Sequence, residues 1–284
     1  MKNIICLKSG ALIVSFVFMA MVFSCTKEST VQNSMDSKRI KNHLVDGKIV
    51  SMNIYDDAGR MVEVNSTVFY VGYSYDSNNR LAKLESAFDL SPGSPLSSIY
   101  YPNMPERPKV FMTSQNSTVD RYDLYRWDKK GRLSKIECFQ KNPNNGKFEC
   151  TSVSDYEYDG SVTKMKSYNE KGELFQYDVT YHTYDHRGNL TNEKTLTETG
   201  LLKQEISYKY DEFKNPLRGL CFFGIPGEFS NVNNIIEKSI TFSYYDEYIT
   251  NKTTYAYQYD DDGYPIKVIT EELGSKWEVE YEYE

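Results

Sequence analysis

The stretch Tyr125–Ile136, with the sequence YRWDKKGRLSKI, has the composition of a β-hairpin. Aromatic residues lead up to Asp128, a short polar segment contains Gly131, and apolar residues follow. The Asp128 carboxylate can accept hydrogen bonds from backbone N–H groups two residues on, and Gly131 can adopt a positive φ at little steric cost. Because aromatic and β-branched residues favour a pleated surface, the stretch predicts strand, turn and strand.

One spacing departs from regular strand alternation. Leu133 and Ile136 are three residues apart, so strict alternation would place them on opposite faces. The same gap separates Met61 from Val64 and Leu81 from Leu84. Either both faces are covered near the turn, or a β-bulge shifts the register; we favour the bulge.

The hairpin unit recurs along the chain. Repetition of one supersecondary unit is a strong indicator of architecture, and here it predicts a series of hairpins in one sheet. Related tips begin at Tyr55, Tyr75, Tyr168, Tyr184, Tyr210 and Tyr259, and a shortened one begins at Tyr158.

The strands between the tips alternate between apolar and polar residues. In Lys276–Tyr283, one face carries Trp, Val and two Tyr, and the other carries Lys and three Glu. This pattern is typical of antiparallel strands with one buried and one wet face. No helix-period apolar run is available to cover the buried face, so the sheet must cover itself. We predict an all-β fold: a single antiparallel meander of hairpins, curled into an open or closed barrel-like sheet.

Two insertions interrupt the repeats. Residues 88–109 contain five prolines, which exclude a regular central strand. Residues 214–234 combine Pro and Gly with several aromatics. We expect long loops, the second of which plugs one end of the sheet; alternatively, one of them forms the rim of a ligand site.

The N-terminus has the features of a targeting segment. Lys2 and Lys8 precede the apolar run Ala11–Phe23, whose thirteen residues are too few for a comfortable membrane span. Val22–Cys25 reads VFSC and resembles a bacterial lipobox, which implies cleavage before Cys25 and lipidation of that cysteine. The alternative is an ordinary signal peptide with a coincidental cysteine.

These features divide the chain into three expected parts. Residues 1–24 are a lipoprotein signal peptide, residues 25–46 are the lipidated cysteine and a flexible polar tether, and residues 47–284 are a single β-hairpin-repeat domain. Removing Lys2 and Lys8 leaves 31 basic against 40 acidic residues, a net charge of −9. An acidic domain argues against nucleic acid as a partner.

The tips resemble the Tyr-Asp (YD) repeats of Rhs-type proteins, most closely at Tyr73–Leu81 and Tyr125–Leu133. Together with the lipobox, they are similar to a family of Bacteroidetes lipoproteins with domain of unknown function 4595, described as having a porin-like fold. The segments 257–265 and 211–216 carry this second resemblance. It implies a fold and a location in the cell envelope, at the outer membrane, but transfers no catalytic residue.

Residues with catalytic potential form no recognisable motif. The chain lacks HExxH, GxSxG and phosphate-loop patterns. A metal shared by His182 and His186 is an alternative to two solvated turn residues. We predict no enzyme activity, no cofactor and no metal.

Cys138 and Cys150 flank the segment Asn142–Gly146. A five-residue loop there would place the two cysteines opposite each other, where an oxidising periplasm would permit a cross-strand disulfide.

The sequence therefore predicts a non-catalytic lipoprotein of the cell envelope, on either its periplasmic or its surface side. It would be held to the membrane by its lipid, and would bind or scaffold a glycan or an envelope protein. The alternatives are a hydrolase acting on glycan or lipid, which needs a cleft with two carboxylates, and a purely structural component, which needs an unpaired strand edge.

Overall fold

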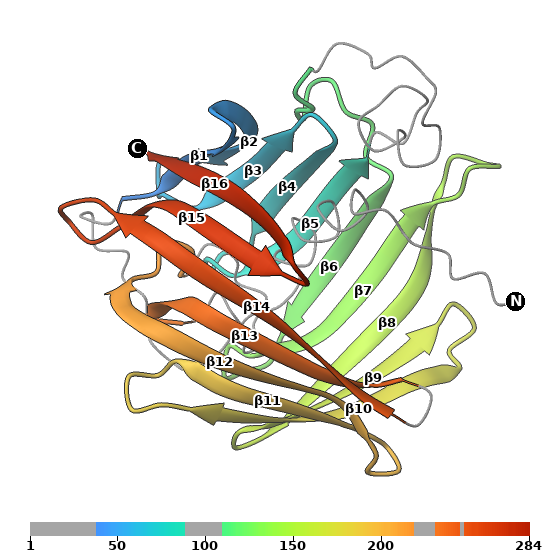
Figure 1. The fold of residues 1–284 in the computed structure, drawn as a ribbon. Coiled ribbons are helices and arrows are strands. Elements are labelled where there is room, and N and C mark those ends of the chain that lie inside the picture. The colour runs from blue at the N-terminus through green and yellow to red at the C-terminus, as the bar shows by residue number, and fades with distance from the viewer. Residues whose placement is uncertain (1–37, 89–109, 219–230, 245–246) are drawn as a thin grey trace, which may run out of the picture.

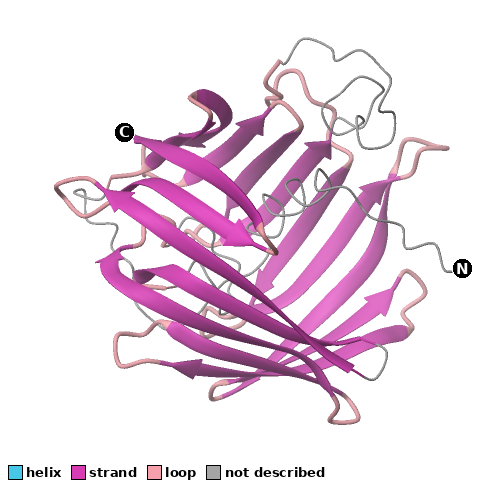
Figure 2. Cartoon of the chain, viewed as in Figure 1, coloured by secondary structure: helices cyan, strands magenta, loops and turns pink. Residues whose placement is uncertain are grey.

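The structure is a computed structural model that describes residues 38–88, 110–218, 231–244 and 247–284. These residues form strands joined by turns and loops (Figure 2). The strands are β1 (Ile40–Val45), β2 (Lys48–Tyr55), β3 (Met61–Ser66), β4 (Phe69–Tyr75), β5 (Leu81–Phe88), β6 (Arg121–Trp127), β7 (Leu133–Lys141), β8 (Phe148–Asp159), β9 (Val162–Asn169), β10 (Leu174–Tyr184), β11 (Leu190–Thr197), β12 (Leu202–Lys214), β13 (Asn233–Tyr244), β14 (Glu247–Tyr259), β15 (Pro265–Glu272) and β16 (Ser275–Tyr283).

The strands form one closed barrel (Figure 1). Each strand pairs antiparallel with the next in the chain, and β1 closes the sheet by pairing with β16. The predicted all-β meander is confirmed, and the barrel is of the closed kind. Among the described residues, no helix is long and apolar enough to cross a membrane.

The closing strand corrects one predicted boundary. Residues 40–45 were expected in the tether, but they form β1, in which Ile40 and Leu44 are buried. Arg39 and Glu284 also exchange two backbone hydrogen bonds across the closure. The segment is too short for its alternation to stand out, and its partner lies at the other end of the chain. The predicted signal peptide and Cys25 lie outside the described residues, as does most of both insertions.

Antiparallel connections alternate between the two ends of the barrel. We call the end with Arg39 and Glu284 the proximal rim, and the opposite end the distal rim. The C-terminal ends of β2, β4, β6, β8, β10, β12 and β14 lie at the proximal rim, on the left of Figure 1. Every predicted Tyr-Asp tip is therefore proximal except the one at Tyr168, which joins β9 to β10 at the distal rim.

The apolar face of the sheet lines the lumen. Leu217, in the connection after β12, packs against a cluster of residues on β3–β7. Strand β12 is at least five strands from this cluster in either direction around the barrel, so the contact crosses the inside. The cluster comprises Met61, Val64, Phe69, Val71, Tyr73, Leu81, Tyr125 and Leu133.

The predicted bulge is present beside the tips. Trp127 pairs with Leu133 while Arg126 pairs with Lys135, so Ser134 has no partner in the ladder. The same shift occurs in the β2–β3 and β4–β5 hairpins. It places Leu133 and Ile136 on the same lumenal face, which explains their three-residue spacing.

Each regular tip is closed by its aspartate. Asp128 Oδ1 accepts the backbone N–H groups of Lys130 (2.8 Å) and Arg132 (2.9 Å), and its Oδ2 accepts Nε–H of Arg132 (2.9 Å). Gly131 has φ +76°. In the β4–β5 tip Asn79 takes the place of glycine at φ +61°, a conformation that asparagine tolerates better than most residues.

The tips are also linked to one another around the proximal rim. Arg80 lies over the ring of Trp127 at 5.7 Å, and the Trp127 indole N–H donates to the carbonyl of Leu81 at 2.7 Å. Arg60 and Tyr75 repeat the arrangement one hairpin earlier. The motif therefore uses its arginine and its aromatic residue to join neighbouring hairpins.

The aromatic link can be tested with Tyr75→Phe. The Tyr75 hydroxyl donates to the Met61 carbonyl at 2.6 Å. Its loss should lower the free energy of unfolding by about 1–2 kcal/mol, measured by urea titration. The matched control is Tyr248→Phe, whose ring is 61% exposed and which should change stability by less than about 0.5 kcal/mol. Equal effects in the two variants would contradict the link.

Candidate functional site

A row of polar side chains crosses the lumen wall on β9–β13. Thr163 Oγ1 lies 3.2 Å from His182 Nε2, and His182 Nδ1 lies 3.8 Å from Glu193 Oε2. The Tyr208 hydroxyl donates to Glu193 Oε1 at 2.7 Å, and Lys238 Nζ lies 5.9 Å from the Tyr208 ring. Tyr125 faces the lumen, and directly paired residues lie on the same face of a sheet. Following the pairing from β6 through β7, β8 and β9 to β10 shows that this polar row also faces the lumen.

The row has the order hydroxyl, imidazole, carboxylate, which is the order of a hydrolase triad. However, 3.8 Å is too long for the hydrogen bond that would orient the imidazole. Thr163 and His182 are both buried, and burial lowers the pKa of His182 to about 4. The row therefore supports a structural role better than catalysis.

The two histidines near the β10–β11 tip are separated by the sheet. His182 is buried in the lumen, whereas His186 is exposed at the tip. Among residues that the structure describes, no three metal-ligating side chains come together. The shared metal that the sequence left open gains no support from this geometry.

Cys138 and Cys150 do not form the disulfide that the sequence left possible. Lys141 pairs with Phe148, so the loop has six residues rather than five, and the register is shifted by one. Cys138 therefore faces Ser152 on the lumenal side, while Cys150 faces Phe139 on the outer side. Both are free thiols. The prediction was wrong because a one-residue slip moves a side chain to the other face of the sheet.

The lumenal thiol should react slowly. Burial raises the pKa of the Cys138 thiol to about 11, and Asp123 adds to the effect. Since the thiolate is the nucleophile, iodoacetamide at pH 8 should modify Cys138 about 100-fold more slowly in the folded protein than in urea. Peptide mass spectrometry without reductant measures this rate. A disulfide-linked peptide pair, or equal folded and unfolded rates, would contradict the assignment.

The outer wall is charged and largely self-paired. Glu237 accepts from Lys209 at 3.0 Å and from Lys252 at 2.8 Å across three strands. Lys267 contacts both Glu278 and Glu280. These ladders occupy the outward positions of the strands whose tyrosines point inward.

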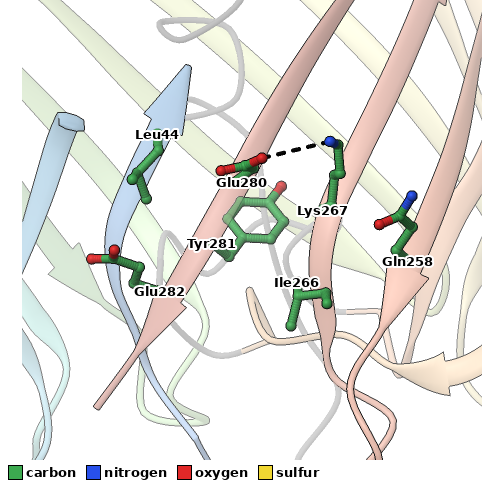
Figure 3. A pocket seen from close by; sticks show the side chains of 7 residues that line it. All are labelled: Leu44, Gln258, Ile266, Lys267, Glu280, Tyr281 and Glu282. Atoms are coloured by element: carbon green, nitrogen blue, oxygen red, sulfur yellow. Dashed lines mark ion pairs between the residues drawn. The ribbon is translucent and has the colours of Figure 1, made fainter. Parts of the chain in front are cut away.

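Two pockets open on this wall and its proximal edge. The first has a volume of about 280 Å³ and lies over β14, β15, β16 and β1 (Figure 3). Its charged groups are already engaged, because Lys267 pairs with Glu280 at 3.5 Å and Glu282 accepts a hydrogen bond from Asn42 at 2.7 Å. Its lining residues are Leu44, Gln258, Ile266, Lys267, Glu280, Tyr281 and Glu282.

The second pocket has a volume of about 290 Å³ and lies beside the β10–β11 tip. It contains His186, and the Arg187–Glu212 ion pair (3.0 Å) spans it. Neither pocket gathers a nucleophile with a base, so neither suits catalysis.

The distal rim differs chemically from the proximal one. The regular proximal tips are closed by their aspartates, whereas neighbouring hairpins expose large apolar side chains at their distal ends. Leu273, between β15 and β16, is one of these side chains and is 65% exposed. We give the name distal crest to the described apolar residues at the distal ends of the β9–β10, β11–β12 and β13–β14 hairpins, at the lower right of Figure 1. Its apolar residues are Leu174 (47% exposed), Phe175 (59%), Leu201 (68%), Tyr248 (61%) and Ile249 (37%).

The crest was not predicted from the sequence. Its signal is an apolar residue close behind a tip glycine, as in Gly200-Leu201 and in Gly172-Glu173-Leu174-Phe175. An apolar residue also follows the tip glycine at the proximal rim, but there its side chain is buried in the lumen. The position of the tip at one end of the barrel or the other distinguishes an exposed residue of this kind from a buried one.

Comparisons with known proteins return distant structures. No family model and no curated protein matches the chain. A porin-like protein from Bacteroides vulgatus ATCC 8482 is similar over 87% of this chain and 99% of its own, with 10% identity and a TM-score of 0.48. A porin-like protein from Bacteroides uniformis ATCC 8492 covers 82% and 95%, with 11% identity and a TM-score of 0.36.

A third structure, a protein with unknown function from Bacteroides fragilis NCTC 9343, is similar over 45% of this chain and 87% of its own. Its identity is 14% and its TM-score 0.29. At these identities and scores, the three likenesses establish neither a family nor an activity for this chain.

Proposed function

We propose that this protein is a non-catalytic lipoprotein of the cell envelope, whose barrel binds or scaffolds a glycan or protein partner through the distal crest. The exposure of the crest carries the proposal. With roughly 200 Å² for a large side chain and about half of each exposed, the five residues present on the order of 500 Å². Exposed apolar patches of this size commonly mark interaction sites.

The charged wall supports a barrel that stands outside the bilayer. A transmembrane barrel needs an outward apolar band, whereas this wall carries ladders such as Lys209–Glu237–Lys252. A lipid on Cys25 would then supply membrane attachment, most economically at the outer membrane. The anchored chain would enter the barrel at the proximal rim and leave the crest on the opposite end.

The tip chemistry supports a finer proposal about kinship. The aspartate-closed turns and the aromatic-arginine links give physical roles to the Tyr, Asp, Gly and Arg of the YD-like motif. We therefore propose that the chain is related to the lipoproteins of domain of unknown function 4595. The purely structural alternative required an unpaired strand edge, and the sheet of the described strands has none, because β1 closes on β16.

Binding is tested by screening the mature protein against bacterial and host polysaccharides and envelope proteins. A crest variant, Phe175→Ser/Leu201→Ser/Tyr248→Ser, should bind its ligand at least about tenfold more weakly. The matched control, Ile54→Ser/Ile236→Ser/Ile266→Ser, changes three exposed apolar residues elsewhere and should bind normally. If both variants bind alike, the crest is not the site.

The anchor is tested separately. Radiolabelled palmitate should be incorporated into the wild-type protein and not into Cys25→Ala. Labelling that persists in Cys25→Ala would disprove the assignment of Cys25.

A further inference from the structure

The apolar side chains of the distal crest are bordered by acidic ones. Glu170 and Glu173 lie in the β9–β10 tip, Glu198 in the β11–β12 tip and Glu247 at the start of β14. All four are exposed. Two cations lie in the described parts of the same hairpin ends, Lys171 and Lys203, and Lys203 is paired with Asp178 at 2.8 Å. The described crest thus combines exposed apolar side chains with a net negative border.

These carboxylates differ from those of the barrel wall. On the wall, Glu237 is held between two lysines. At the crest, the side-chain partner of Glu173 is the amide of Asn169 (2.8 Å), which leaves its charge in place. Within the described residues, Glu170, Glu198 and Glu247 have no ion pair. Their charges are therefore available to an incoming partner.

We propose that the crest binds a polypeptide that presents Lys or Arg side chains around an apolar centre. This inference rests on the proposed binding function and names its partner class. An apolar centre excludes water, while surrounding charges of opposite sign fix orientation and speed association. Phosphate-rich lipid surfaces and acidic glycans would instead meet like charge at Glu170, Glu198 and Glu247. A neutral glycan would gain nothing from the acidic border.

The size of the crest fits this partner class. A standard protein interface buries about 800 Å² on each side, with an apolar centre and a polar rim. The apolar crest supplies on the order of 500 Å² by itself, and its acidic border would supply much of the remainder. The three hairpins follow one another around the barrel, so their distal ends form one continuous part of the rim.

The test uses the full chain and two synthetic peptides, KKLWLLKK and EELWLLEE, with affinities measured by isothermal titration calorimetry at low and high salt. The lysine-flanked peptide should bind at least about tenfold more tightly than the glutamate-flanked one, with an advantage that shrinks in salt. Equal binding of the two peptides would overturn the inference.

Matched variants locate the interaction. Glu170→Gln/Glu198→Gln/Glu247→Gln should weaken binding of the lysine-flanked peptide about tenfold. The control Glu237→Gln/Glu278→Gln/Glu280→Gln makes the same change of charge on the wall and should bind within about twofold of wild type. Equal weakening by both would mean non-specific attraction to an acidic protein and would also overturn the inference.

Failure here is distinguishable from failure of the proposed function. If a screened ligand is lost with Phe175→Ser/Leu201→Ser/Tyr248→Ser but binds the glutamine crest variant normally, the binding function stands and the basic partner is wrong. If the serine crest variant keeps every ligand, the proposed function itself is wrong.

Discussion

Replacing Leu133 with alanine is expected to lower the free energy of unfolding by about 2–5 kcal/mol. The side chain is fully buried in the lumenal cluster, beside the tip that closes the β6–β7 hairpin. Truncation removes its transfer free energy and leaves a cavity, because the barrel wall on which its neighbours are fixed cannot collapse inward far enough to fill it. Urea unfolding followed by tyrosine fluorescence measures the loss as a fall in midpoint at unchanged slope.

Leu201→Ala is the matched control for this change. It removes the same atoms from a residue that is 68% exposed on the distal crest, so stability should change by no more than about 0.5 kcal/mol. Similar losses in the two variants would mean that the Tyr-Asp hairpins are not held by a lumenal core. A loss at Leu201 alone would contradict the burial of Leu133 in the lumen.

The hairpin architecture was predictable because its determinants are local. Asp128 and Gly131 define a tip within five residues, and the same chemistry recurs at the other tips. The bulge was predictable from the spacing of Leu133 and Ile136 alone, since only a register shift can put both on one buried face. Once every hairpin is known, the meander follows, because neighbouring hairpins have no other partner for their edges.

Features that depend on distant pairing were not predictable. Closure of the barrel joins residues about 240 positions apart, so residues 40–45 looked like tether rather than strand. The disulfide prediction failed on a single residue of loop length, which no local pattern fixes. The crest depends on which end of the barrel each tip occupies. Successive connections alternate between the two ends, so the end that a tip occupies depends on whether an even or an odd number of strands precedes it. The residues of the tip itself do not decide it.

Acid is expected to destabilise the barrel in two stages, the first of which comes from its histidines. Burial lowers the pKa of both His43 and His182 to about 4. In the unfolded chain a histidine titrates near pH 6.5, so the unfolded state binds more protons between about pH 6.5 and 4. Stability is therefore complete above this window and falls within it, by about 1.4 kcal/mol per pH unit for each histidine.

The second stage comes from the proximal tips. Burial raises the pKa of each tip aspartate, but hydrogen bonds from the tip, led by the one from Lys38 in the case of Asp260, outweigh it and leave the pKa below its ordinary value. Such a carboxylate stabilises the fold above its unfolded pKa, and this contribution is lost as pH falls through the folded pKa. Stability should therefore fall further below about pH 4. The aspartates are Asp56, Asp76, Asp128, Asp185 and Asp260.

Urea midpoints measured from pH 8 to pH 2 separate the two stages. His182→Gln should halve the slope between about pH 6.5 and 4, because His43 still titrates there, and should leave the acid limb intact. Asp76→Asn/Asp128→Asn should lower stability at pH 7 and reduce the slope only below about pH 4, because two of the five tip carboxylates have lost the charge that acid would remove. A wild-type profile that stays level from pH 7 to pH 4 would show that the two histidines are not held neutral in the folded barrel. A double aspartate variant as steep as wild type in acid would show that the tips are held by their backbone conformation and not by their carboxylates.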